Sequence, residues 1–129
     1  MEKSTAVLIH PELSYHVVGR AFDVYNEIGA GYKEQVYQKA LSKAFKDSGL
    51  NFKEQVYSPV AYANENVGRY YLDFVVDDKV VVELKSGDKF IKQNIKQVYS
   101  YLKANKLQLG ILINFTREGV KFRRIVNLN

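Results

Sequence analysis

The sequence predicts an α/β protein: a mixed sheet flanked by helices, with the elements in the order α-α-β-β-β-α-β-β. Two stretches with apolar residues at helical spacing open the chain, and three strand-like segments separated by short turns follow them. A third helical stretch then precedes a nearly continuous apolar run and a last short strand. Strands joined by short turns pair antiparallel, whereas a strand reached through a helix is typical of a parallel neighbour. The sheet should therefore contain both kinds of pairing.

Each helix is predicted from its apolar spacing and from the residues that end it. The first covers residues 11–28 and stops at the Gly-Ala-Gly stretch that begins at Gly29. The second covers residues 33–48 and the third covers residues 90–105. The apolar positions behind these assignments are Leu13, Val17, Ala21, Val24 and Ile28, then Val36, Tyr37, Ala40, Leu41, Ala44 and Phe45, then Ile91, Ile95, Val98 and Leu102.

The strands are predicted from short runs rich in Val, Ile, Tyr and Phe. Residues 52–63 form the first strand, and Pro59 within it predicts an edge position or a bulge. Turn-forming residues 64–68 lead into a strand over residues 70–76, which a short loop joins to a strand over residues 80–85. The two remaining strands are residues 107–114, an apolar run typical of a strand buried on both faces, and residues 120–126.

Two acidic residues stand among the apolar residues of the central strands. If residues 77–79 form a three-residue loop, Val76 pairs with Val80 and Asp73 falls directly opposite Glu83. Like charges at opposed positions destabilise a hairpin, and buried charges persist when they are paired or bind a metal. A divalent cation would stabilise the pair, and Mg²⁺ takes one or two carboxylates while keeping waters for a substrate phosphate. The other interpretation is a solvated polar face.

Period-two alternation assigns the side chains of these strands to faces. Glu83 and Lys85 share a face, on which the Lys85 ammonium would orient or deprotonate an attacking water, or neutralise charge on a phosphate. The other interpretation of Lys85 is a simple ion pair with Glu83. On the preceding strand, Tyr71, Asp73 and Val75 are expected on one face, and Leu72, Phe74 and Val76 on the other.

Polar residues on two helices are further candidates for the site. Glu34 opens the second helix on the stripe of Tyr37 and Leu41, so its carboxylate either points to the sheet as a third metal ligand or complements the helix dipole. On the third helix, Gln97 and Tyr101 would bind substrate or a metal-bound water, unless they form a solvated edge. Candidate phosphate contacts are Lys89, Lys92, Lys96 and Lys103 with this helix, and Lys121, Arg123 and Arg124 on the last strand.

Composition limits the class of protein. The chain has 129 residues, enough for one domain over residues 1–129 with a substantial core. It has no cysteine, which excludes disulfides, thiolate metal sites and a cysteine nucleophile, and favours a cytoplasmic location. No apolar run reaches the length of about 20 residues that crosses a bilayer, so no membrane association is expected. The net charge of +5 favours a polyanionic partner such as nucleic acid.

Three motifs resemble those of one group of nucleases. Asp73, nine further residues and then Glu83-Leu84-Lys85 resemble the Asp…(Asp/Glu)-x-Lys signature of the PD-(D/E)xK superfamily, with Leu72 where the signature has proline. The segment Gly31-Tyr32-Lys33-Glu34-Gln35-Val36-Tyr37 is similar to the Gly-x-x-Glu-x-x-Tyr motif of the GxxExxY family. Residues 97–101 and 109–115 look like the C-terminal half of that family. The resemblance covers nearly the whole chain.

The resemblance implies a restriction-endonuclease-like core, with the site at the hairpin of the second and third strands. It makes Asp73 and Glu83 the metal carboxylates and gives the metal the backbone carbonyl of Leu84. It makes Lys85 the residue that assists the attacking water, and Glu34 a helix-borne acid. Gln97 and Tyr101 resemble the Gln-x-x-x-Tyr motif of exonuclease-like branches.

These residues lead to the hypothesis of a Mg²⁺-dependent nuclease, with Mn²⁺ as a substitute, that hydrolyses phosphodiester bonds in DNA. A homodimer or a protein partner would supply the selectivity that one small domain lacks. The alternative is a non-catalytic nucleic-acid-binding or regulatory module on the same fold. A third interpretation, a protein-interaction domain, makes the positive charge incidental.

Overall fold

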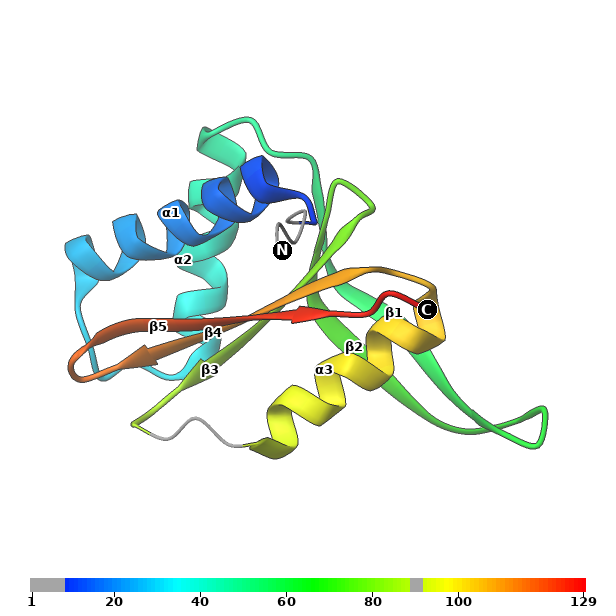
Figure 1. Cartoon of the computed structure of the whole chain (residues 1–129). Coiled ribbons are helices and arrows are strands. Elements are labelled where there is room, and N and C mark those ends of the chain that lie inside the picture. The colour runs from blue at the N-terminus through cyan, green and yellow to red at the C-terminus, as the bar shows by residue number, and fades with distance from the viewer. Residues whose placement is uncertain (1–8, 89–91) are drawn as a thin grey trace, which may run out of the picture.

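The computed structural model describes residues 9–88 and 92–129. Two helices come first, a five-stranded sheet follows, and a third helix joins the third and fourth strands (Figure 1), which confirms the predicted element order. In the described part of the chain, no helix is both long enough and apolar enough to cross a membrane. The elements are α1 (Pro11–Ile28), α2 (Glu34–Asp47), β1 (Phe52–Tyr62), β2 (Glu65–Val76), β3 (Val80–Ser86), α3 (Lys92–Asn105), β4 (Leu109–Thr116) and β5 (Gly119–Val126).

The sheet has the strand order β1-β2-β3-β4-β5 and is mixed, as predicted. β3 and β4 pair parallel, because α3 carries the chain from one end of the sheet back to the other, and the remaining neighbours pair antiparallel. β1 lies at an edge, which agrees with the position predicted from Pro59. β4 is buried along its whole length, as the apolar run predicted.

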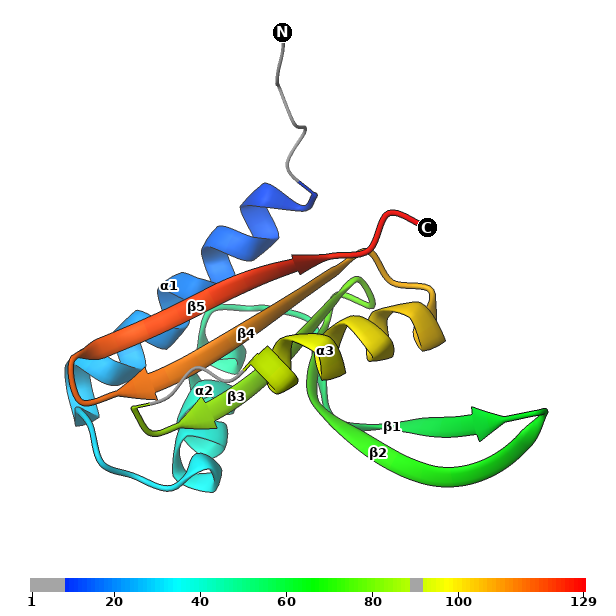
Figure 2. The same cartoon turned by 60° about the horizontal axis from the view of Figure 1, so that its bottom comes forward.

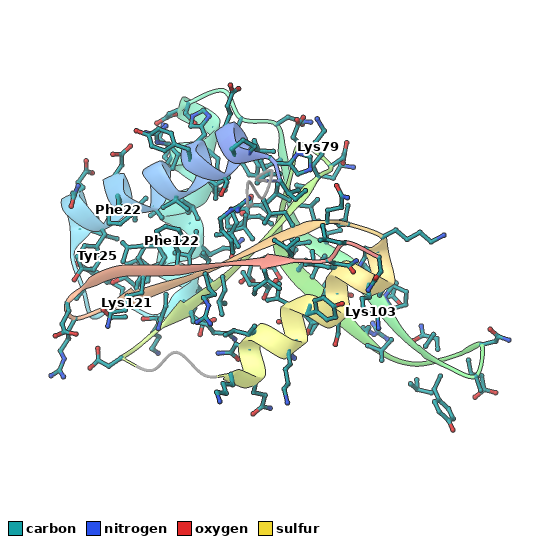
Figure 3. All side chains as sticks on the ribbon, in the orientation of Figure 1. Phe22, Tyr25, Lys79, Lys103, Lys121 and Phe122 are labelled. Carbon is teal, nitrogen blue, oxygen red and sulfur yellow. The ribbon has the colours of Figure 1, made fainter. Side chains whose placement is uncertain are left out.

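Helices cover both faces of the sheet, so the core has two parts (Figure 2). α1 and α2 pack on one face, where Tyr37 of α2 stacks on Phe115 of β4 with ring centroids 4.1 Å apart. α1 lies along β4 and β5: the Tyr25 hydroxyl donates to the Thr116 carbonyl at 2.8 Å, and Figure 3 shows Phe22 and Tyr25 beside Phe122. α3 packs alone on the other face, over Val81, Leu112 and Ile125.

The first hairpin turn is tighter than the sequence predicts. Residues 65–68, expected in a turn, belong to β2, because Ala63 and Asn64 alone make the connection. Both have positive φ, 51° and 67°, which is the backbone of a two-residue turn whose twist matches that of the strands. A register shift between Val60 and Ala61 then absorbs one extra residue.

The start of β4 also differs from the prediction. Leu107 donates its N–H to the Leu102 carbonyl at 2.9 Å and so closes the end of α3, which delays the strand to Leu109. Lys106, with φ 56°, makes the left-handed turn that this closure requires. At the other end of the helix, residues 90 and 91 of the predicted range lie outside the described residues.

Substitution of Gly110 is expected to destabilise the packing of α3 on the sheet. A Cβ at Gly110 would lie 2.6 Å from Cγ1 of Val98 on α3, and a β-branched side chain in a helix has little freedom to move aside. We expect Gly110→Ala to lower the free energy of unfolding by about 1–3 kcal/mol, measured by urea denaturation. Gly68→Ala is the control, because its Cβ would meet nothing closer than 3.8 Å. Equal stability of the two variants would contradict this account.

Candidate active site

Asp73 lies where β2 changes face. Leu72 packs in the core cluster with α3, whereas Phe74 packs in the cluster with α1 and α2. The prediction that Leu72, Phe74 and Val76 share one face is therefore wrong, although they stand at alternate positions of one strand. The edge strand changes face at the same level, since Phe52 packs toward α1 and α2 and Val56 toward α3.

At Asp73, the regular pairing of β2 with both of its neighbours, β1 and β3, is interrupted. β1 and β2 pair at Glu54↔Phe74 and Val56↔Leu72, and the intervening Gln55 has φ 48°. On the other side of β2, the predicted Val76↔Val80 pair is confirmed, but the pairing ends at Phe74↔Val82. Asp73 and Glu83 therefore do not form the regular opposed pair that the hairpin register predicts.

Side chains replace the missing ladder bonds around Asp73. Oε1 of Glu83 accepts the Asp73 N–H at 2.8 Å, and Oδ2 of Asp73 accepts the Leu84 N–H at 2.8 Å. The Asp73 carbonyl accepts from Nε2 of Gln38 on α2 at 3.1 Å. The two carboxylates thus bind across the gap between β2 and β3, and this satisfies backbone groups that the bend leaves without strand partners.

Glu83 is almost completely buried, with 3% of its surface exposed. Burial and, to a lesser extent, the nearby charge of Asp73 raise the pKa of its carboxyl to about 8, against the hydrogen bonds from Asp73 and Tyr70 and the charge of Lys85, which lower it. The Tyr70 hydroxyl donates to Oε2 at 3.1 Å, and the Tyr70 ring stacks on Tyr101 of α3 with centroids 4.2 Å apart. α3 therefore fixes the position of Glu83 through Tyr70.

Asp73 and Lys85 complete the charged centre. Burial raises the pKa of the Asp73 carboxyl, while the Leu84 N–H, the Gln55 amide at 3.4 Å and the charge of Lys85 lower it. Lys85 is half-buried and follows Glu83 by two residues in a regularly paired strand, so the two share a face as predicted. The positive charge of Lys85 acts on both carboxylates.

Glu34 lies beside this centre at the start of α2. It is exposed, unlike Tyr37 and Leu41 on its stripe, which are buried, so Glu34 lies outside the hydrophobic core. The first turn of α2 lies at the edge of the hydrophobic core, so Glu34 is exposed to solvent although Tyr37 and Leu41, further along the same side of the helix, are buried. A cavity of about 210 Å³ nevertheless joins it to Asp73; its lining is Glu34, Gln35, Gln38, Gln55, Asp73 and Leu84.

The Gly-x-x-Glu-x-x-Tyr segment holds this cavity in place. Gly31 has φ 95°, a conformation that favours glycine, and so permits the turn from α1 into α2. The buried Tyr37 donates its hydroxyl to the Gly29 carbonyl at 2.7 Å, which fixes that turn against the helix. The first and last residues of the segment are thus structural, and the middle one, Glu34, lines the cavity.

The donor set suits a hard divalent cation. Each carboxylate oxygen has two lone pairs, and among the residues that the structure describes each oxygen of Asp73 and Glu83 accepts one hydrogen bond. Lone pairs therefore remain for a cation, whose positive charge would stabilise both ionised carboxylates against the burial that raises their pKa values and against the repulsion by Asp73 that also raises the pKa of Glu83. Across residues 9–88 and 92–129, no three side chains of His, Cys, Asp or Glu gather as a metal cluster.

The other predicted residues lie at different distances from the centre. Tyr101 is buried next to Tyr70, whereas Gln97, one turn earlier on α3, is exposed. Lys92 and Lys96 are exposed on the same helix, and Lys89 lies outside the described residues. Arg124 is bound to α1, because its guanidinium donates to Oγ of Ser14 and to the Ile9 carbonyl.

Sequence reasoning missed three residues that contact the centre: Gln38, Gln55 and Tyr70. Gln38 follows Glu34 by four residues, so helical spacing would have identified it as a neighbour of the same cavity. The contacts of Gln55 and Tyr70 depend on the change of face at Asp73, for which the apolar pattern of β2 has no signal.

A mixed sheet between helices, with two carboxylates and a lysine on its central hairpin, is the architecture of restriction-endonuclease-like proteins. The chain belongs to the PD-(D/E)XK nuclease superfamily, because the model of that family matches residues 11–125.

A solved structure described as "Crystal structure of SSO0001" has a similar fold, with a TM-score of 0.56 and 14% sequence identity. The similarity covers 92% of this chain and 59% of that chain, so this chain spans less than two thirds of that protein's length. At such identity the likeness concerns the fold alone. None of the curated proteins compared with the chain matches it.

Proposed function

We propose that this protein is a Mg²⁺-dependent nuclease that hydrolyses phosphodiester bonds in DNA, and that within its superfamily it is a GxxExxY protein. The observation that carries the proposal is a pair of carboxylates, Glu83 buried and Asp73 half-buried, that bind across β2 and β3 with Lys85 next to them. Membership of the nuclease superfamily supports the same chemistry. Mn²⁺ is expected to substitute for Mg²⁺, because both prefer oxygen ligands.

In the proposed mechanism, Asp73 and Glu83 would hold the cation, together with the Leu84 backbone carbonyl. A cation held there would supply Lewis-acid activation of the phosphate and of water. The Lys85 ammonium orients the attacking water and offsets negative charge that develops on the phosphate. Tyr70 keeps its proton, since burial and the adjacent Glu83 raise its pKa, and so it holds the Glu83 carboxylate in place. Glu34, Gln35 and Gln38 line the cavity beside Asp73 and position the outer side of the site.

The charge distribution supports a polyanionic substrate. The chain has a net charge of +5, and Lys92, Lys96 and Lys103 on α3 are exposed to solvent. These lysines are proposed to contact the phosphate backbone of the nucleic acid. Gln97 and Tyr101, on the same helix, are proposed to bind the substrate nearer to Asp73 and Glu83. We further propose that the protein acts as one domain in the cytoplasm, with a partner or a second copy adding selectivity.

The proposal is tested by Mg²⁺- or Mn²⁺-dependent cleavage of single-stranded, duplex and branched DNA, with RNA in parallel. We expect Lys85→Ala to lower the cleavage rate by about 10²-fold or more, because it removes a charge that acts on the transition state. Lys79→Ala, at the exposed turn between β2 and β3, is the control and should cleave normally. Equal rates for Lys85→Ala and the unmodified protein would contradict the proposed role of Lys85.

A non-catalytic nucleic-acid-binding module is the second candidate, and one observation favours it. All four carboxylate oxygens of Asp73 and Glu83 already accept hydrogen bonds within the protein, so the hairpin is held together without a cation. Such a module would bind DNA in a salt-dependent manner but would neither need a divalent cation nor cut the strand. Metal-free binding without cleavage on every substrate would favour it.

A further inference from the structure

Two tyrosines form an exposed aromatic pair on the β1–β2 hairpin. Tyr57 and Tyr71 are paired across the strands, with 47% and 44% of their surfaces exposed and ring centroids 5.8 Å apart at an angle of 54°. The alternate residues Val56, Tyr70 and Leu72 pack toward α3. The two tyrosines therefore project from the opposite face of the β1–β2 hairpin, whose far end extends past the helices (Figures 1 and 2).

This pair continues directly from the candidate active site. Tyr71 precedes Asp73 by two residues and Tyr57 follows Gln55 by two, and both Asp73 and Gln55 line the cavity beside α2. Two residues of a strand span at most about 6.6–6.8 Å, so the backbone of each tyrosine lies within about that distance of a residue that lines the cavity. Arg69, also exposed, is the next residue on this side of β2.

The order of side chains along this face matches the chemistry of a nucleotide strand. A carboxylate that binds a cation would take the scissile phosphate, the aromatic pair offers flat apolar surface, and Arg69 offers a positive charge beyond it. Aromatic side chains bind bases by stacking, which is tolerant of sequence because every base has a π-face. The bases of a duplex already stack on one another, so only an unpaired base can stack on the two tyrosine rings.

We infer that Tyr57 and Tyr71 form a stacking platform for an unpaired base next to the scissile phosphate, so that the substrate is a single strand. This inference rests on the proposed function, which supplies the phosphate at Asp73. It adds a substrate class and two binding residues on β1 and β2. The platform, rather than the lysines of α3, then discriminates between single-stranded and duplex DNA, because phosphate contacts alone are shared by both.

The test measures binding separately from cleavage. A fluorescein-labelled oligothymidylate and a labelled duplex are titrated with the protein, with Ca²⁺ in place of Mg²⁺, and anisotropy is recorded. The variants are the double substitutions Tyr57→Leu with Tyr71→Leu and Tyr57→Phe with Tyr71→Phe. We expect the leucine variant to bind the single strand about tenfold more weakly or worse, and the phenylalanine variant to bind it nearly normally, since only the latter keeps the π-faces. Duplex binding should change little in either.

Tyr15→Leu is the matched control, because Tyr15 is an exposed tyrosine of α1, 84% exposed, away from β1 and β2. Circular dichroism of each variant checks the fold. Single-strand binding that is unchanged in the leucine variant, or lost equally in the phenylalanine variant, would overturn the platform. The same variants, assayed for cleavage with Mg²⁺, separate the two proposals. Normal cleavage of the single strand by the leucine variant would support the nuclease and contradict the platform. If single-strand binding depends on the two tyrosines but the protein cleaves no substrate, the platform is supported and the nuclease is contradicted.

Discussion

Asp73→Asn is expected to abolish metal-dependent cleavage while the protein stays folded. Asparagine has the same shape, and its carbonyl oxygen can still accept the Leu84 N–H that Oδ2 accepts at 2.8 Å. What the substitution removes is the negative charge, and with it half of the carboxylate pair that binds the cation. We expect the cleavage rate to fall by about 10³-fold, measured under single-turnover conditions with Mg²⁺ and with Mn²⁺.

Asp77→Asn is the matched control for this substitution. Asp77 belongs to the same hairpin but lies at the β2–β3 turn, where its φ of 54° is one that asparagine tolerates. Its carboxylate pairs with Lys79 at 3.5 Å, an exposed ion pair that contributes little to stability. Cleavage should therefore be normal in Asp77→Asn. Full cleavage activity of Asp73→Asn would contradict the proposed role of Asp73 in the mechanism.

Glu83→Gln is expected to stabilise the metal-free protein and to inactivate it. The pKa of Glu83 is about 8 in the folded protein, above its ordinary value of 4.5, so the folded state holds this proton more tightly than the unfolded state does. The stability of the unmodified protein therefore falls as the pH rises from about 4.5 to about 8, by about 1.4 kcal/mol per pH unit at most. Glutamine does not ionise, so the stability of the variant does not fall in this way as the pH rises.

The measurement is thermal unfolding in EDTA at several values between pH 5 and pH 8. The melting temperature of Glu83→Gln relative to the unmodified protein should rise steadily across this range, and it should show little difference at pH 5. Glu118→Gln, which removes a carboxylate 83% exposed, serves as the control and should show no such trend. A difference that is constant with pH would mean that Glu83 is ionised throughout and that burial does not hold its proton.

Element order and strand pairing could be predicted because each rests on a local pattern. Apolar spacing located the helices, Pro59 indicated the edge strand, and the short loop after Val76 set the register with Val80. The turn at residues 63 and 64 was harder to predict, because a positive φ at Ala63 is unfavourable and only the strand pairing of β1 with β2 imposes it.

The bend at Asp73 could not be predicted from the sequence, and it decides the geometry of the site. Residues 70–76 are uniformly apolar or aromatic apart from Asp73, so a regular alternating strand was the natural expectation. What breaks the alternation is a set of bonds from distant residues, Gln38 on α2 and Glu83 on β3, to the Asp73 backbone. The sequence thus predicted which carboxylates come together but not that they replace part of the sheet.

The most direct test of the central claim, that Asp73 and Glu83 form a divalent cation site, is calorimetric titration with Mn²⁺. At pH 7, in buffers with different heats of ionisation, we predict one bound ion and the release of protons, because Glu83 with a pKa of about 8 must lose its proton to bind. Asp73→Asn should show no binding. Binding that persists unchanged in Asp73→Asn, or no binding by the unmodified protein, would contradict the claim.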